Sequence, residues 1–215
     1  MKILVTAGPT REPIDPVRFI SNRSSGKMGY AVASAALARG HSVALISGPV
    51  ALAPPRGAEL FMVETASEML AAVRRRIAWC DALVMVAAVA DWRPLRYAAR
   101  KLKKDRMPAA LRLAPTPDIL ASLTPAKRGK IFVGFAAETG ALKSEALRKL
   151  KAKRLDLIVA NRVGRAGTGF GSDFNRVVFF SAGGGTREMP LMRKTAVARE
   201  IIRWIERRTS FKRSA

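Results

Sequence analysis

The residues best suited to chemistry lie in one stretch near the start of the chain, TAGPTREPIDPVRFISNRSSGKMG, which runs from Thr6 to Gly29. Asn22 has a neutral amide that can donate a hydrogen bond to an acyl oxygen and accept one from an amine. Arg18, four positions earlier, can bind a carboxylate or a phosphate through two parallel hydrogen bonds. Asn is also common in turns and helix caps, which leaves a purely structural role open. Together the two side chains favour a site for an anionic group.

The same stretch resembles a phosphate-binding loop in composition, although it matches neither G-x-G-x-x-G nor G-x-x-x-x-G-K-[ST]. A helix beginning near Gly26 would direct unpaired N–H groups and a partial positive charge toward a ligand. A tight turn explains each glycine equally well when it is considered singly. We expect a phosphate group here, bound by Gly8, Ser24, Ser25 and Gly26.

Four polar segments follow predicted strands: TAGPTREP, AAVADWRP, GFAAETG and VANRVG. In an open α/β sheet, ligands bind beyond the carboxyl ends of the strands, so these segments should meet at one edge. Asp91 follows a central strand directly, and there it could accept a hydrogen bond from a ribose hydroxyl or cap a helix. Lys101 and Lys103 could reach a polyphosphate as mobile cations, but a solvated run of charge explains them too.

Convincing pairs of carboxylates for acid–base hydrolysis do not occur in the sequence, and no residue is set up as a nucleophile. An enzyme built on these residues would work by holding its reactants together and stabilising charge.

The elements that must position these residues follow a repeated β-α pattern. Short apolar runs predict strands at 2–8, 42–47, 58–64, 82–90, 130–139 and 155–161. Helices are predicted at 27–38, 67–80 and 142–153, the second opened by a capping box of Thr65 and Glu68. We therefore predict an α/β fold with a Rossmann-like, doubly wound and mainly parallel sheet.

The last part of the chain has a different pattern. RVVFFS, the turn AGGGT and REMPLM predict an antiparallel hairpin, and an amphipathic helix with Val197, Ile201 and Trp204 on one face closes the chain. Residues 92–116 are basic and weakly patterned, which is typical of a functional or disordered loop. We expect one nucleotide-binding domain over residues 1–208 and a basic tail at 209–215.

The composition excludes several classes of protein. The chain has 215 residues and 49% hydrophobic content, enough for one sizeable core. Its single cysteine, Cys80, excludes an internal disulfide, and its single histidine, His41, excludes a histidine-rich metal cluster. We expect no signal peptide, and no apolar run comes near the roughly 18 residues of a membrane span. We expect a cytoplasmic, soluble protein with no membrane partner.

The formal net charge of +23 suggests a nucleic acid as partner. The basic residues, however, are spread from Lys2 to Arg213, with local clusters at 74–76, at 100–106 and in the last twenty residues. We therefore expect nucleic acid to bind only through non-specific charge.

An ordered series of motifs resembles one family. TAGPTREPIDPVRFISNRSSGKMG, AAVADWRP, KLKK, TPDIL, GFAAET and DLIVAN occur in this order. Nearly the whole chain, from Lys2 to about Trp204, is similar to phosphopantothenate–cysteine ligase, the synthetase half of the bacterial coenzyme A biosynthesis protein. The long first motif is the most specific of the series.

The resemblance implies a reaction in two steps. The carboxylate of 4′-phosphopantothenate attacks the α-phosphate of CTP, which gives an acyl-cytidylate and pyrophosphate. The amine of cysteine then attacks the activated carbonyl and releases CMP. ATP is the usual eukaryotic nucleotide, and the sequence does not decide between the two. Mg²⁺ would arrive with the triphosphate, so no dedicated metal-binding residues are expected.

The resemblance also assigns residues. Asn22 matches the asparagine that handles the acyl-cytidylate, Arg18 a nearby arginine, and Lys101 the lysine that faces the triphosphate; these three are the catalytic candidates. Further nucleotide-binding positions match Ala87, Asp91, Pro117, Asp118, Ile119, Leu120, Phe135, Lys149 and Lys153.

The chain departs from the family pattern at two places. The resemblance also implies two protein partners, a decarboxylase and a second copy of this chain. Arg162 stands where the family has an acid, and RYAAR before KLKK is more basic than usual. No flavin-binding decarboxylase precedes Met1, so we expect a stand-alone synthetase or part of a fused protein, with a separate decarboxylase as a possible partner. The family forms homodimers, for which the 176–192 hairpin and the stretch after Trp92 are candidates, and the active site would be completed across the dimer.

Two alternatives remain. Tyr97 and Lys101 have the Y-x-x-x-K spacing of short-chain oxidoreductases, which places a phenol and an ammonium on one helical face. No serine lies between Asp91 and Tyr97, and no acid ends the 42–47 strand to hold a ribose hydroxyl. The second alternative is a basic module that binds nucleic acid.

Overall fold

A computed structural model describes residues 1–104, 109–162 and 171–213. Its main sheet has eight strands in the order β13-β12-β10-β9-β6-β1-β4-β5. The six from β10 to β5 are parallel, and β12 and β13 are antiparallel to their neighbours. The bounds are β1 Lys2–Ala7, β4 Ser42–Ser47, β5 Glu59–Met62, β6 Ala82–Met85, β9 Ile131–Glu138, β10 Leu157–Arg162, β12 Val177–Ser181 and β13 Thr186–Glu188.

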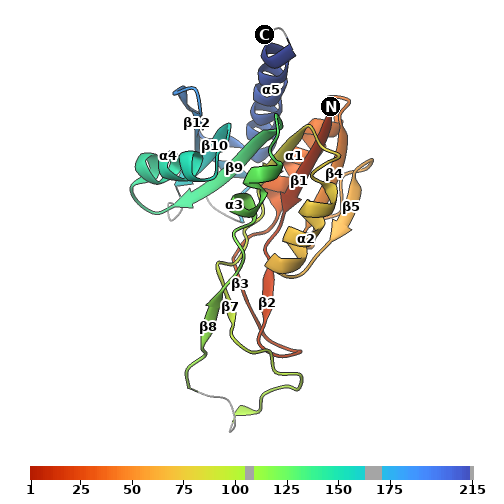
Figure 1. Cartoon of the computed structure of the whole chain (residues 1–215), viewed down its shortest axis with the longest axis vertical. Coiled ribbons are helices and arrows are strands. Elements are labelled where there is room, and N and C mark those ends of the chain that lie inside the picture. Colours follow the sequence, from red (N-terminus) through yellow and green to blue (C-terminus); the bar gives the residue numbers. More distant parts are fainter. Residues whose placement is uncertain (105–108, 163–170, 214–215) are drawn as a thin grey trace.

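Helices cover both faces of this sheet (Figure 1). Ile3 and Val5 of β1 face the core shared with α1 (Lys27–Leu37) and α5 (Lys194–Arg213). Leu4, between them, faces the opposite core, formed with α2 (Ala66–Arg76), α3 (Ile119–Leu123) and α4 (Leu142–Ala152). A 3₁₀ turn, η2 (Thr124–Ala126), follows α3. Alternate side chains of a strand point to opposite faces, so both faces are apolar. The predicted doubly wound α/β fold is confirmed.

Most predicted elements form near their predicted bounds. The capping box that opens α2 is present, because Thr65 accepts from the backbone N–H of Glu68 while the Glu68 carboxylate accepts from that of Thr65. α2 ends at Arg76, earlier than predicted, and the chain continues as a turn in which Trp79 N–H donates to Arg76 C=O. In the closing helix Val197 and Ile201 are fully buried, and Trp204 packs beside them, as predicted.

The predicted C-terminal hairpin is correct only in part. β12 pairs with β13 through a glycine-rich turn, but β13 ends at Glu188. The rest of REMPLM leaves the sheet, and β14 (Met192–Arg193) pairs instead with β11 (Phe174–Asn175). α5 begins directly after β14, so this small two-stranded sheet fixes the start of the closing helix.

A long extension, which we call the arm, projects from the main sheet (Figure 1). It consists of residues 11–21 and the described residues of 92–115. In it β2 (Arg11–Pro13) pairs with β3 (Phe19–Ser21), and β7 (Trp92–Pro94) pairs with β8 (Leu113–Pro115). The hairpin at 11–21 was not predicted, and the prediction of an unpatterned loop at 92–116 was wrong at both of its ends. These strands have three residues each, too few to show a period of two.

Among the described residues, no helix is both long enough and apolar enough to cross a membrane.

Candidate functional site

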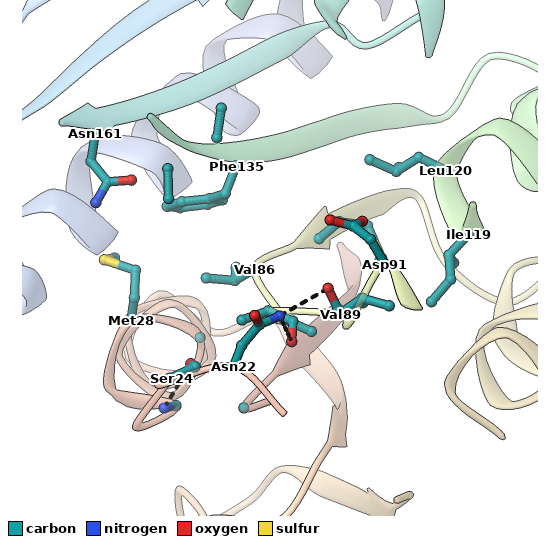
Figure 2. Close-up of a pocket in the computed structure, with 18 of the residues that line it drawn as sticks. Asn22, Ser24, Met28, Val86, Val89, Asp91, Ile119, Leu120, Phe135 and Asn161 are labelled. Atoms are coloured by element: carbon teal, nitrogen blue, oxygen red, sulfur yellow. Dashed lines mark hydrogen bonds between the residues drawn. The ribbon is translucent and has the colours of Figure 1, made fainter. Parts of the chain in front are cut away.

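A cavity of about 440 Å³ lies at the carboxyl ends of the central strands. The chain order reverses between β1 and β6, since β4 and β5 extend the sheet on one side and β9 and β10 on the other. Ligands of open α/β sheets bind at such a switch point. Figure 2 shows Asn22, Asp91, Phe135 and Asn161 around the space.

The start of α1 forms one wall of the cavity. Gly26, the N-cap, has a φ of 78°, and neither a side-chain cap nor an acidic residue occupies the first turn. A Cβ on Gly29 would lie 2.5 Å from the Cβ of Ala7, so only glycine lets α1 approach β1 this closely. Uncapped N–H groups at a helix start favour an anion. Gly8, Ser24, Ser25 and Gly26 all line the cavity here.

The loop after β6 forms the opposite wall, and here the predicted strand at 82–90 is too long. β6 ends at Met85 because threonine hydroxyls take over from the strand ladder. Thr6 Oγ1 accepts from the N–H groups of Val86 and Ala87, each at 3.2 Å, and Thr10 Oγ1 accepts from that of Ala90 at 2.9 Å. The backbone after Met85 is therefore held as a curved wall of the cavity.

Asn22 bridges from the first motif to this loop. Its Nδ2 donates to the carbonyl oxygens of Ala88 and Val89, each at 3.0 Å, as the dashed lines in Figure 2 mark. Both partners are acceptors, so the NH₂ group must face them. The donors of this amide are therefore committed to the loop, and Oδ1 is its atom for a ligand.

Basic side chains lie at another part of the cavity, beside α3 and α4. Asp118 caps α3 by accepting from Ala121 N–H at 3.1 Å, and its second oxygen lies 3.1 Å from Lys153 Nζ. Lys149 Nζ lies 2.6 Å from Glu138. These ion pairs fix the direction of two ammonium groups beside the space.

The remaining predicted positions can now be placed. Besides the residues described above, the cavity is lined by Ala87, Asp91, Pro117, Ile119, Leu120 and Phe135. Asp91 C=O accepts from Thr116 N–H at 2.9 Å, which joins the loop after β6 to the segment that enters α3. The fold thus gathers nearly every residue assigned by the sequence analysis around one space.

Arg18, Lys101 and Lys103 are the exceptions. All three lie in the arm and none of them lines this cavity. The Arg18 guanidinium binds the carboxylate of Asp15 and the carbonyl oxygen of Leu102 at 2.7 Å, and Lys101 is exposed. The segment from Tyr97 to Lys101 is not helical, so the spacing expected of an oxidoreductase does not place its phenol and ammonium on one helical face.

The sequence analysis missed several lining residues: Lys27, Met28, Val86, Val89, Asn161, Asn175 and Lys194. Asn161 lies in VANRVG, a segment already expected at this edge. Asn175 and Lys194 had no local signal, because the pairing of β11 with β14 brings them to the cavity. Burial and the nearby Lys27 lower the pKa of Lys194.

A second cavity of about 370 Å³ lies beside the first and shares Lys27 and Lys194 with it. Across the described part of the chain, no three His, Cys, Asp or Glu side chains gather to bind a metal ion.

Residues 1–208 match the model of the family described as DNA/pantothenate metabolism flavoprotein C-terminal domain. The coenzyme A biosynthesis bifunctional protein CoaBC of Bacillus subtilis (strain 168) is 48% identical over 204 residues, which cover 94% of this chain and 50% of that protein. The protein of the same name from Escherichia coli (strain K12) is 42% identical over 206 residues, again 94% of this chain and 50% of the relative. The chain therefore spans about half the length of these relatives.

Solved structures agree with this match. The crystal structure of the C-terminal domain of a CoaBC protein has a TM-score of 0.84 and 41% identity, and the match covers 97% of this chain and 95% of that one. A Cab2 mutant, solved in complex with phosphopantothenate-cysteine, has a TM-score of 0.78 at 17% identity, over 99% of this chain and 88% of that one. The second likeness shows a shared fold.

Proposed function

This chain belongs to the family of DNA/pantothenate metabolism flavoprotein C-terminal domains, and from that membership we propose that it is a phosphopantothenate–cysteine ligase. It joins 4′-phosphopantothenate to cysteine in coenzyme A biosynthesis, with CTP as the activating nucleotide. The observation that carries the proposal is the commitment of the Asn22 amide donors to the loop after β6, at a cavity suited to a nucleotide.

Activation comes first, because a free carboxylate is a poor electrophile. A carboxylate oxygen of 4′-phosphopantothenate bonds to the α-phosphorus of CTP, and the bond to pyrophosphate breaks. The N–H groups at the start of α1, with Ser24 and Ser25, stabilise the negative charge of the phosphates. Phe135, Lys149, Lys153 and the 117–120 segment hold the nucleotide. In this proposal the acyl-cytidylate lies between α1 and the loop after β6.

Aminolysis follows. The cysteine nitrogen bonds to the acyl carbon, the bond from that carbon to the phosphate oxygen breaks, and CMP leaves with the electron pair. The nitrogen, initially an ammonium, gives up two protons in all, which pass to the solvent. Asn22 Oδ1 accepts a hydrogen bond from the attacking amine, since its NH₂ group already binds Ala88 and Val89. Asn22 thus orients the nucleophile.

Magnesium accompanies the triphosphate. Mg²⁺ is commonly bound by substrate phosphates and one or two carboxylates. Asp91 and Asp118 are the carboxylates of the cavity, but Asp118 already caps α3 and pairs with Lys153. Asp91 is therefore the better placed to meet a hydrated ion, whose charge would offset that of the phosphates.

We also propose that the chain works as a homodimer. Arg18 and Lys101 lie in the arm, away from their own cavity, and the arm exposes Phe19, Trp92 and Tyr97. An arm that packs against a second copy would bury these side chains and bring Arg18 and Lys101 to the partner's cavity. In this arrangement residues 1–208 act as one synthetase domain in the cytoplasm, alongside a flavin-dependent decarboxylase on the same or another chain.

The test is turnover of 4′-phosphopantothenate with magnesium and labelled CTP, with and without cysteine. We expect pyrophosphate in both cases and CMP only when cysteine is present. Asn22→Asp should slow CMP release by about 100-fold or more, because a carboxylate has no N–H to hold the loop. Arg23→Gln is the matched control: it alters the neighbouring exposed residue, which does not line the cavity.

The outcomes separate the parts of the proposal. Preference for ATP over CTP would keep the reaction and change the nucleotide. No turnover with either nucleotide, from a folded wild-type protein, would reject the ligase and favour a basic module that binds polyanions.

A further inference from the structure

The loop after β6 has five backbone N–H groups, those of residues 86–90, and one of them differs from the rest. Oxygens of the first motif accept hydrogen bonds from the other four, which belong to Val86, Ala87, Ala88 and Ala90. The Val89 N–H has no hydrogen-bond partner among the residues that the structure describes. Val89 is half-buried and lines the main cavity. The loop therefore offers one backbone donor to a ligand.

The peptide bond between Ala88 and Val89 fixes the direction of this N–H. Ala88 C=O accepts from Thr10 N–H at 3.3 Å and from Asn22 Nδ2 at 3.0 Å, so it points toward the first motif (Figure 2). In a planar trans peptide the N–H points the opposite way. β6 lies between β1 and β9, and residues 135–137 of β9 line the cavity. The Val89 N–H therefore points away from the first motif, toward the side of the cavity that β9 forms.

The two hydrogen bonds to Ala88 C=O also make the Val89 N–H a stronger donor. They draw electron density toward the carbonyl oxygen, and hydrogen bonds that share one peptide group strengthen one another in this way. The other four N–H groups of the loop are bound, so the donor is held in place before a ligand arrives. A donor fixed in advance is most effective toward an atom that gains negative charge during a reaction.

Aminolysis creates such an atom beside this loop. As the cysteine nitrogen bonds to the acyl carbon, an electron pair of the carbonyl bond moves onto the acyl oxygen, and it returns when the bond to CMP breaks. Asn22 cannot stabilise this oxygen, because its N–H groups are committed to Ala88 and Val89. The phosphates lie against the start of α1, on the opposite wall. Resting on the proposed ligase function, we propose that the Val89 N–H is the oxyanion donor of aminolysis, and that Asn22 and Thr10 position it.

The direct test replaces Val89 by 2-hydroxy-3-methylbutanoic acid, which keeps the side chain and puts an ester oxygen in place of the N–H. Release of CMP from preformed acyl-cytidylate, after cysteine is added, should slow by about 100-fold, the usual cost of losing one oxyanion donor. Pyrophosphate release before cysteine is added should change by no more than about threefold, because the acyl oxygen gains little charge in that step. The same replacement at Val63 is the matched control and should leave both rates unchanged. It removes an N–H outside the cavity that donates to Ser47 C=O at 3.0 Å.

Two further measurements do not depend on the ester variant. Thr10→Val removes the hydroxyl that holds the Ala90 N–H, so it should slow CMP release about tenfold, and Thr10→Ser should restore the rate. In wild-type protein labelled with 15N-valine, the assigned Val89 amide proton should move downfield when 4′-phosphopantothenate and CTP form the acyl-cytidylate, but not when CMP binds alone. Thermal unfolding of each variant shows whether it is folded.

Three results would overturn the oxyanion donor. They are unchanged aminolysis in the folded ester variant, equal slowing of pyrophosphate and CMP release, and a Val89 amide shift with CMP alone as large as with the acyl-cytidylate. The second and third would assign the N–H to a phosphate oxygen. If the wild type released no pyrophosphate with either nucleotide, the ligase itself would fail, and that outcome is distinct from these three.

Discussion

The main sheet buries its apolar side chains, whereas the arm exposes many of its own. Ile3, Leu4 and Val5 of β1 have no exposed surface, since α1 and α2 cover the two faces of the sheet. Most large apolar side chains exposed in the described residues belong to the arm. They are Val17, Phe19, Trp92, Leu95, Tyr97, Leu111 and Leu113.

This difference separates two ways of holding a shape. The sheet is stabilised by burial on both faces, so its geometry is fixed within one chain. The arm relies on short hairpins and hydrogen bonds, among them Leu95 N–H to Arg112 C=O at 2.8 Å and Ala98 N–H to Ile14 C=O at 3.0 Å. Large apolar side chains exposed together in this number favour an interaction surface. The arm should therefore depend on a second copy, and the sheet should not.

The largest effect on the free energy of unfolding should follow from a change at Gly29, where α1 packs most closely on β1. Gly29→Val places a Cβ 2.5 Å from the Cβ of Ala7 and 3.0 Å from Thr6 C=O. We expect a loss of roughly 3 kcal/mol or more of unfolding free energy, measured by chemical denaturation. Gly140→Ala is the control, because apart from Gly140 and its two chain neighbours no atom of the described residues lies within 4 Å of its Cβ position. Equal stability of the two variants would show that α1 can move away from β1 at little cost.

A change in the arm should leave the fold intact and separate the two copies of the proposed homodimer. Replacing Phe19 and Trp92 by Ser should raise the dissociation constant of the dimer by about 100-fold or more, because buried aromatic side chains dominate interfaces. Light scattering over a range of protein concentrations measures the molar mass and so the fraction of dimer. Met62→Ser removes a similarly exposed apolar side chain from β5, and it should leave the dimer unchanged. A wild-type protein that is a fully active monomer would contradict the proposed assembly.

A smaller effect, confined to the stability of the arm, should follow from loss of the Asp15 carboxylate. This carboxylate joins the two halves of the arm. Its carboxylate accepts from the Arg18 guanidinium and from the N–H groups of Val17, Arg18 and Leu102. The Arg18 hydrogen bond, helped by these N–H groups, holds the pKa of Asp15 far below its usual range. The arm is therefore stabilised above about pH 4, the ordinary pKa of Asp, and loses this contribution as the pH falls toward the lowered value.

Hydrogen exchange tests this expectation. Asp15→Asn should lower the protection of the Leu102 amide about tenfold at pH 7 and leave β1 unaffected. In the wild type the same amide should lose protection at low pH before the sheet does. Simultaneous loss in arm and sheet would mean that the two regions open as one unit.

The smallest effect on the free energy of unfolding should come from removing the N-cap of α2, a helix that packs on the sheet. Thr65→Ala removes the side chain that caps α2 and should cost about 1 kcal/mol, measured by chemical denaturation. Ser67→Ala alters an exposed residue in the first turn of α2 and is the matched control. The dimer should survive both changes, because neither residue belongs to the arm.

The sequence predicted the sheet because its signals are local. Apolar runs mark buried parallel strands, and polar residues directly after them must lie at the edge where ligands bind. For this reason Asp91 could be placed at this edge before the structure was known, whereas Phe135 was assigned by the resemblance alone; both line the cavity. Lys149 of α4 and Lys153, its C-cap, were likewise assigned by the resemblance.

The features that the sequence did not predict depend on contacts between residues that are distant in the chain. β6 ends at Met85 because Thr6 and Thr10, from another segment, bind the amides that follow it. Asn175 and Lys194 reach the cavity through a strand pair of two residues each, which leaves no periodic pattern. The strands of the arm were not predicted for the same reason, since three residues are too few to show an alternating pattern.

The bridge from Asn22 to Ala88 and Val89 also bears on how such a chain can evolve. The bonded residues are 66 and 67 positions apart, and these two hydrogen bonds join their segments directly. A mutation that removes the amide loses two backbone contacts at once, and a longer or shorter loop after β6 moves the carbonyls out of reach. The two segments should therefore be inherited as one unit, and a chimera that exchanges only one of them between distant relatives should be inactive although every residue in it is natural.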